Sequence, residues 1–219
     1  MKSLLVIQHE ADTPPGTTLE WAALRGYTVH HWAPGTDAPP VKTDFDLVVI
    51  CGGSMDTFEE EKHPWLVVEK EFIRKLVKNN TKIFGLCLGS QLLAEILGGS
   101  VHQHHGWEIG FVPVKTRDAS TLQAFHWHRY TFELPPGAEL LCEGSFCKNQ
   151  AFTFGKNIMA TQFHPETTEQ WIRECAEEVA LNKKAYTGLV QSEKDMLASL
   201  PLQKDLKHWY FDQLDQLVK

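Results

Sequence analysis

The sequence has no apolar run of the roughly 20 residues that a bilayer-spanning helix requires. It also has no cluster of Lys and Arg that could follow a phosphate backbone, and its formal net charge is −7. A phosphate loop of the G-x-x-x-x-G-K type is missing as well. The first of these absences predicts no membrane partner, and the second predicts no nucleic-acid partner. The apolar run Leu4–Ile7 leads to Gln8 without a small-residue cleavage site, so we expect a buried first strand rather than a signal peptide.

The chain has five cysteines, an odd number that does not suit a full disulfide framework. We expect a reducing compartment, the cytoplasm, in which a free thiol survives. Cys142 and Cys147 have no partners at metal-site spacing, so a zinc ribbon is not expected. His126 and His128 alternate on a predicted strand and could share a metal, but no Cys or acidic residue stands at a regular spacing from them. We expect no metal and no cofactor.

Apolar runs typical of strands alternate with segments whose apolar residues recur at helical spacing. Strands are expected at residues 4–8, 27–32, 46–51 and 82–85, and helices at 17–26, 64–78 and from 88 to about 98. This alternation predicts an α/β fold with a doubly wound, mostly parallel central sheet. Between Ser100 and about Phe154, short strands and turns predict a small mixed or antiparallel extension, and His102, His104 and His105 are expected in a solvated loop.

Cys87 lies in the segment Gly85-Leu86-Cys87-Leu88-Gly89-Ser90-Gln91, between a predicted strand and a predicted helix. A sharp strand-to-helix turn presents a nucleophile in the G-x-S-x-G elbow, and glycines permit the tight backbone. The N-terminus of the helix favours thiolate over thiol. The segment therefore indicates a cysteine nucleophile, although a buried structural cysteine fits the same pattern.

A second motif, His164-Pro165-Glu166, follows an apolar extended run. Proline favours an extended conformation at His164, and residues two apart in extended chain face the same side. Glu166 could then orient His164, which would act as the base for Cys87. The two motifs together predict a Cys87-His164-Glu166 triad.

Together the two motifs resemble those of the class I glutamine amidotransferases, a family with a flavodoxin-like sheet. Cys51-Gly52-Gly53-Ser54 resembles the family's oxyanion loop. The segments 106–110 and 125–132 resemble those of a standalone, GMP-synthase-like subgroup. Where that subgroup usually has Trp-His-Gly-Asp, this chain has Arg129 and Tyr130 in place of Gly-Asp. This departure bears on the substrate or acceptor and leaves the predicted triad intact.

The resemblance implies roles for further residues. It places the oxyanion between backbone N–H groups of the Gly52-Gly53 loop and of Leu88, lets Gln91 contact the glutamine moiety, and puts His128 in the substrate cleft. It covers residues 1–185 as one domain. The apolar spacing of Leu206, Tyr210 and Leu214 predicts a C-terminal helical extension, residues 186–219, that packs on this domain or mediates a homodimer.

The predicted activity is hydrolysis of the glutamine side-chain amide through a cysteinyl thioester, with ammonia released to a separate acceptor protein. Two alternatives remain. The same triad would serve a γ-glutamyl peptidase or hydrolase, and a catalytically idle binding subunit could have the same fold.

Overall fold

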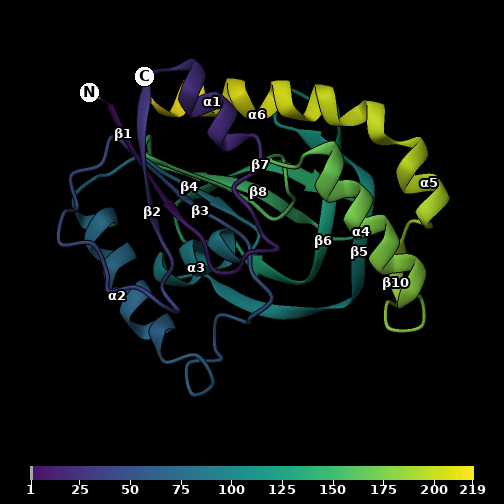
Figure 1. The fold of residues 1–219 in the computed structure, drawn as a ribbon, viewed down its shortest axis with the longest axis horizontal. Helices are drawn as coiled ribbons and strands as arrows, with labels where there is room; N and C mark the ends of the chain where they lie inside the picture. Colours follow the sequence, from purple (N-terminus) through teal and green to yellow (C-terminus); the bar gives the residue numbers. More distant parts are fainter. Residues whose placement is uncertain (1) are drawn as a thin grey trace.

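Ten strands join into one sheet across residues 2–219, the part of the chain that the computed structural model describes. The strand order is β10-β5-β7-β8-β9-β4-β3-β1-β2, and β6 pairs with β5 beside this path. The sheet contains both parallel and antiparallel pairs, so the predicted α/β architecture is confirmed (Figure 1).

Five neighbouring strands form the parallel part of the sheet. They are β2 (Tyr27–Trp32), β1 (Lys2–Ile7), β3 (Leu47–Ile50), β4 (Ile83–Leu86) and β9 (Ile158–Thr161). The strands β3, β4 and β9 are buried along their whole length, which matches their continuous apolar sequences. Their carboxyl ends meet at one edge of the sheet, where ligands bind in open α/β sheets.

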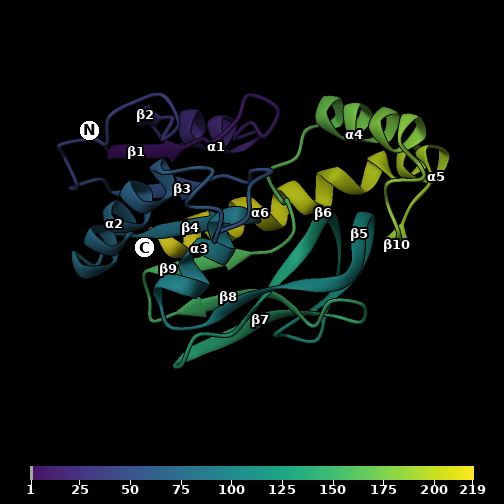
Figure 2. The same ribbon diagram turned by 90° about the horizontal axis from the view of Figure 1, so that it is seen from below.

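The antiparallel part continues the same sheet beyond β9. It consists of β8 (Asn149–Phe154), β7 (Ala138–Gly144), β5 (Ser100–Thr116) and β6 (Thr121–Glu133). The short strand β10 (Gly188–Val190) adds to β5 in parallel. Figure 2 shows β5 to β8 extending away from the parallel strands.

Helices cover both faces of the parallel strands. The helices α2 (Trp65–Lys78) and α3 (Leu88–Ile96) pack on one face, where they bury side chains such as Leu5 and Ile50. The helices α1 (Thr18–Leu24) and α6 (Gln203–Leu217) pack on the opposite face against Leu4 and Val49. Figure 1 shows α1 and α6 together along one side of the molecule and α2 on the other.

The remaining helices cover the antiparallel part. These are α4 (Glu169–Leu181), α5 (Glu193–Ala198) and the short 3-10 helix η1 (Leu200–Leu202). Their buried side chains, among them Ile172 and Met196, pack on Ile109 of β5 and Phe125 of β6. In residues 2–219 no helix is both long and apolar enough to cross a membrane.

The C-terminal segment is joined to the first helix by side-chain contacts. Tyr210 and Leu214 are fully buried beside Trp21. The Trp21 Nε1–H donates to Asp215 at 2.9 Å, and the Tyr210 hydroxyl lies 2.9 Å from the hydroxyl of Thr18. The segment after residue 185 thus contributes to the core with helices and with the strand β10. A domain boundary at residue 185 stays a prediction.

Two expectations about residues 100–154 are wrong. The strands β5 and β6 are long, with 17 and 13 residues, rather than short. His102, His104 and His105 lie in β5 and not in a loop. Pairing with β6 holds residues 100–103 in extended conformation, and His104 and His105 lie at the register shift between Gln103 and Glu108.

Candidate active site

Cys87 occupies a strained turn between β4 and α3. Its backbone has φ 47° and ψ −105°, a region that residues other than glycine rarely adopt. Its N–H donates to the Thr161 carbonyl of β9 at 2.8 Å, which holds the turn against the neighbouring strand. A Cβ atom at Gly89 would collide with the Ile50 carbonyl, so the turn also requires glycine there. The elbow predicted from the sequence is therefore present.

His164 and Glu166 follow β9 and lie beside Cys87. The backbone N–H of His164 donates to the Phe125 carbonyl at 2.8 Å, which fixes the residue against β6. Its Nδ1 lies 2.8 Å from Oε1 of Glu166, so Nδ1 donates to the carboxylate and Nε2 is left for another partner. All three predicted triad residues are buried, with Cys87 only 7% exposed.

The electrostatics of this group favour a charged imidazole. Burial opposes the charge, but the Glu166 carboxylate and the Cys87 sulfur raise the pKa of His164 from 6.5 to about 10. At neutral pH His164 is then an imidazolium beside the sulfur.

Gly52 and Gly53 follow β3 and face the same group. A Cβ atom on Gly52 would lie 3.0 Å from Cε1 of His164 and 3.6 Å from Cβ of Cys87, so the glycine permits this close approach. The Gly52 carbonyl accepts from Nδ1 of His9 at 2.8 Å and from the Thr13 hydroxyl at 3.2 Å.

His9 is held in turn by a buried carboxylate. Its Nε2 lies 2.9 Å from Oε1 of Glu69, and both side chains are fully buried. In a trans peptide the carbonyl and the following N–H point in opposite directions. By holding the Gly52 carbonyl, His9 therefore directs the Gly53 N–H away from itself. That N–H donates to no other group among residues 2–219.

A cavity of about 540 Å³ opens in front of Cys87. Of the residues predicted for the site, Gly53, Cys87, Gln91, His128 and His164 line it. Gly52, Leu88 and Glu166 are close to the others but do not line the cavity.

The outer part of the cavity wall is aromatic and charged. Trp107, Trp127, Tyr130, Trp171 and Tyr186 contribute rings to it. The Arg129 guanidinium lies between two of these rings, 5.4 Å from the centre of Trp107 and 5.3 Å from that of Tyr130. Several carboxylates, among them Asp56 and Glu178, also line the cavity. Its volume lies within the usual range of ligand pockets.

Gln91 lies in the site and contacts protein groups. Its Nε2 donates to Oε1 of Gln162 at 3.2 Å and to the Tyr130 carbonyl at 3.3 Å. The sequence alone assigns no role to Gln162, whose Nε2 lies 3.6 Å from the sulfur of Cys87. The sequence feature that could have identified Gln162 is its position directly after the strand β9 and just before the His164 motif.

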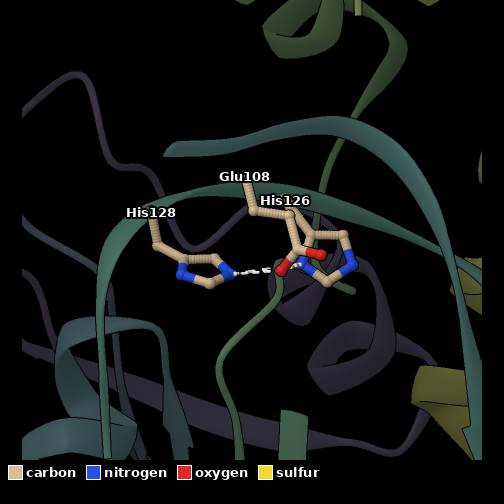
Figure 3. A group of neighbouring side chains, drawn as sticks. All are labelled: Glu108, His126 and His128. Atoms are coloured by element: carbon tan, nitrogen blue, oxygen red, sulfur yellow. Dashed lines mark hydrogen bonds and ion pairs between the residues drawn. The ribbon is translucent and has the colours of Figure 1, made fainter. Parts of the chain in front are cut away.

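His128 belongs to a second buried group, with Glu108 and His126. Its Nε2 lies 3.0 Å from Oε2 of Glu108 (Figure 3). Its Nδ1 donates to the Tyr130 carbonyl at 3.0 Å. The sequence alone assigns no role to Glu108 either. The signal was only indirect, because Glu108 comes from β5 and faces His128 through the pairing of β5 with β6.

Comparisons with known proteins agree with this architecture. The chain is 28% identical to a glutamine amidotransferase-like protein, YfeJ of Salmonella typhimurium, over 96% of this chain and 91% of the relative. It is 30% identical to one subunit of the glutamine-hydrolysing GMP synthase of Sulfurisphaera tokodaii, over 56% of this chain and 68% of the relative.

More distant similarity extends to a peptidase, while a solved structure matches the entire fold. γ-Glutamyl peptidase 3 of Arabidopsis thaliana is 26% identical over 64% of this chain and 61% of the relative. The crystal structure of a glutamine amidotransferase from Thermotoga maritima superposes with a TM-score of 0.88 at 28% identity, covering 100% of this chain and 98% of that one. The profile of the glutamine amidotransferase class-I family matches residues 22–173. This chain therefore belongs to the class I glutamine amidotransferase family.

Proposed function

We propose that this chain hydrolyses the side-chain amide of glutamine, or a similar γ-glutamyl amide, through a thioester on Cys87. The observation that carries the proposal is the Cys87 sulfur at a strained elbow, beside an imidazole whose pKa is raised to about 10, on the wall of a 540 Å³ cavity. Family membership supports the same reaction class.

The first half of the reaction forms the thioester. The Cys87 thiolate attacks the amide carbon, and the charge that develops on the oxygen is met by the N–H groups of Gly53 and Leu88. The Leu88 N–H is the first of α3, where the N–H groups have no intrahelical partner. His164 gives its proton to the departing nitrogen as the carbon–nitrogen bond breaks, and ammonia leaves.

The second half of the reaction releases glutamate from the enzyme. Neutral His164 takes a proton from water, which attacks the thioester carbon, and the carbon–sulfur bond breaks. Glutamate leaves, and the thiolate–imidazolium pair returns. Glu166 acts throughout by holding the Nδ1 proton, while His9 keeps the Gly53 N–H in place. Losing one oxyanion donor costs about 2.7–4 kcal/mol of barrier in enzymes of this kind.

A second candidate function is cleavage of γ-glutamyl peptides by the same chemistry. The cavity extends past the sulfur to the aromatic wall, which offers contact surface to a group attached to the γ-glutamyl nitrogen. The similarity to γ-glutamyl peptidase 3 supports this candidate. Arg129 and the nearby carboxylates also suit the carboxylate and ammonium groups of an amino acid.

Ammonia transfer would require a second protein. The similarity to one component of a GMP synthase supports a separate acceptor polypeptide. We expect such a complex to act in the cytoplasm, where a thiol nucleophile stays reduced. A homodimer is the alternative assembly.

The test compares glutamine with γ-glutamyl dipeptides at equal concentration, following ammonia and glutamate release by the purified chain. A glutamine-like electrophile, followed by mass spectrometry, identifies the reacting residue. We expect an adduct on Cys87 and none on Cys142, a buried thiol whose pKa burial raises to about 12. Preference for peptides by orders of magnitude would replace the glutaminase assignment with a peptidase. If Cys87 is not labelled, the chain would instead be a catalytically idle binding subunit.

A further inference from the structure

Three buried side chains converge on one point beside the cavity wall. Glu108 comes from β5, whereas His126 and His128 come from β6 and point to the same face of the sheet (Figure 3). Each contributes one atom that can bind a metal, and all three residues are buried.

The three atoms form a nearly equilateral triangle. Oε2 of Glu108 lies 3.0 Å from Nε2 of His128 and 3.3 Å from Nδ1 of His126, and the two nitrogens are 3.3 Å apart. With metal–ligand bonds of about 2.0–2.1 Å, donor atoms lie about 3.0 Å apart in an octahedral site and about 3.4 Å apart in a tetrahedral one. The triangle therefore has the dimensions of one face of a metal site.

The ring nitrogen of His128 that faces the carboxylate is the one that can bind a metal ion. The Tyr130 carbonyl can only accept, so Nδ1 of His128 carries a proton, and Nε2 is the atom of this ring that points toward Glu108. A cation at the centre of the triangle attracts all three lone pairs at once.

Groups around the triangle have the arrangement of a metal-site outer shell. Metal-binding histidines commonly donate their other N–H to a carbonyl, as His128 does to Tyr130. Gln150 donates to Oε2 of Glu108 at 2.7 Å and would hold the carboxylate in place. Oε1 of Glu108 is buried without a hydrogen-bond partner, which is unusual for a network built only of hydrogen bonds.

We propose that Glu108, His126 and His128 bind a divalent transition-metal ion, with Zn²⁺ the ion that best matches two imidazoles and a carboxylate. Three protein ligands leave at least one coordination position for water or for Oε1 of Glu108. The ion would join β5 to β6 immediately after the register shift between Gln103 and Glu108. It would thereby fix His128, Arg129 and Tyr130 in the cavity wall.

The test titrates chelator-treated protein with ZnCl₂ against a chromophoric chelator. It uses the Cys87→Ser variant throughout, because Cys87 and His164 could otherwise bind zinc themselves. We expect one ion per chain, and His126→Gln in this background should weaken binding on the order of 100-fold or more. His105→Gln, which changes an exposed histidine on β5, should leave the affinity unchanged.

Co²⁺ provides an independent readout that does not depend on activity. Visible absorption bands of Co²⁺ bound to nitrogen and oxygen ligands should form with the parent and be lost with His126→Gln, while circular dichroism verifies that each variant is folded. Absence of binding in the Cys87→Ser protein, or equal binding by the His126→Gln variant, would overturn the proposal. The group would then be a metal-free hydrogen-bond network.

Discussion

Three of the buried histidines that lie beside a carboxylate, His9, His126 and His164, have pKa values shifted in different directions. Burial opposes the charge at all three rings. At His164, Glu166 and Cys87 overcome it and raise the pKa to about 10. At His9, Glu69 and the Gly52 carbonyl overcome it and raise the pKa. At His126, burial dominates over Glu108 and lowers the pKa to about 3.

The number of negative groups per ring accounts for the difference. His164 has both a carboxylate and the Cys87 sulfur to itself. His126 shares Glu108 with His128, and the neighbouring His128 and His164 further disfavour its charge. A carboxylate within hydrogen-bonding distance therefore does not by itself produce an imidazolium in a protein interior.

Replacing Cys87 by Ser removes one of the two negative groups at His164, and it should have the largest effect. Because serine is a far weaker nucleophile without a matched base, we expect amide hydrolysis to fall on the order of 10⁴-fold or more. The pKa of His164 should fall toward its usual value, as followed by NMR titration of the ring. The Cys142→Ala variant serves as the control, and near-normal turnover by Cys87→Ser would refute the assigned nucleophile.

Glu166→Gln removes the other negative group and keeps a hydrogen-bond acceptor. We expect kcat to fall about 10²–10⁴-fold, by analogy with triads in which the orienting acid becomes an amide. The imidazolium persists up to about pH 10 in the parent protein, so the rate should decline only as pH approaches that value. In the Glu166→Gln variant the alkaline decline of the rate should move toward neutral pH. If the rates of the parent and the variant decline at the same pH, Glu166 does not have the role assigned to it.

The same substitution has a consequence for folding. The pKa of His164 is about 10 in the folded chain and 6.5 as the reference value. Its stabilising contribution is therefore fully present below pH 6.5 and is lost as pH rises through about 10. The difference in unfolding free energy between the parent and Glu166→Gln, measured by denaturant titration, should shrink across that range.

Glu69→Gln weakens the negative environment of His9 and should have a smaller effect. With the His9 ring held less firmly, the Gly52 carbonyl and the Gly53 N–H are less well fixed. We expect kcat to fall about 10-fold with little change in KM, less than the loss of an oxyanion donor. Glu71→Gln, an exposed change on the same helix, is the matched control. A change in KM alone would point to substrate binding instead.

Arg129→Ala removes a positive group of the cavity wall. This group does not contact His9, His126 or His164. We expect KM for a γ-glutamyl dipeptide to rise about fivefold, corresponding to roughly 1 kcal/mol, with kcat and the alkaline decline unchanged. Arg117→Ala, an exposed change distant from the cavity wall, is the control. A shift of the pH profile would show that Arg129 acts on His164.

Local sequence patterns predicted the features that depend on neighbouring residues. Gly85 to Gln91 predicted a turn between a strand and a helix, and the structure has β4, Cys87 and α3 there. Spacing by two residues predicted that His164 and Glu166 lie on the same side of an extended chain. Their side chains do form a hydrogen bond of 2.8 Å, but Pro165 and Glu166 lie in a turn rather than in extended chain.

Features that depend on strand register could not be predicted in this way. Glu108 meets His128 only because β5 and β6 pair in one particular register after an irregularity at residues 103–108. His9 meets Glu69 across 60 residues of sequence, and no short pattern relates them. The strand β10 has three residues, too few for a periodicity, and it forms because β5 offers it a free edge.

The strained backbone at Cys87 has a consequence for how activity could be lost. A residue other than glycine at φ 47° carries an energetic penalty of order 1 kcal/mol, which glycine would avoid. Replacement of this one residue by glycine would thus abolish chemistry while relaxing the fold and leaving the cavity open. A relative that only captures its ligand, as a sensor or carrier, is separated from a hydrolase by a single substitution that removes the backbone strain at this turn.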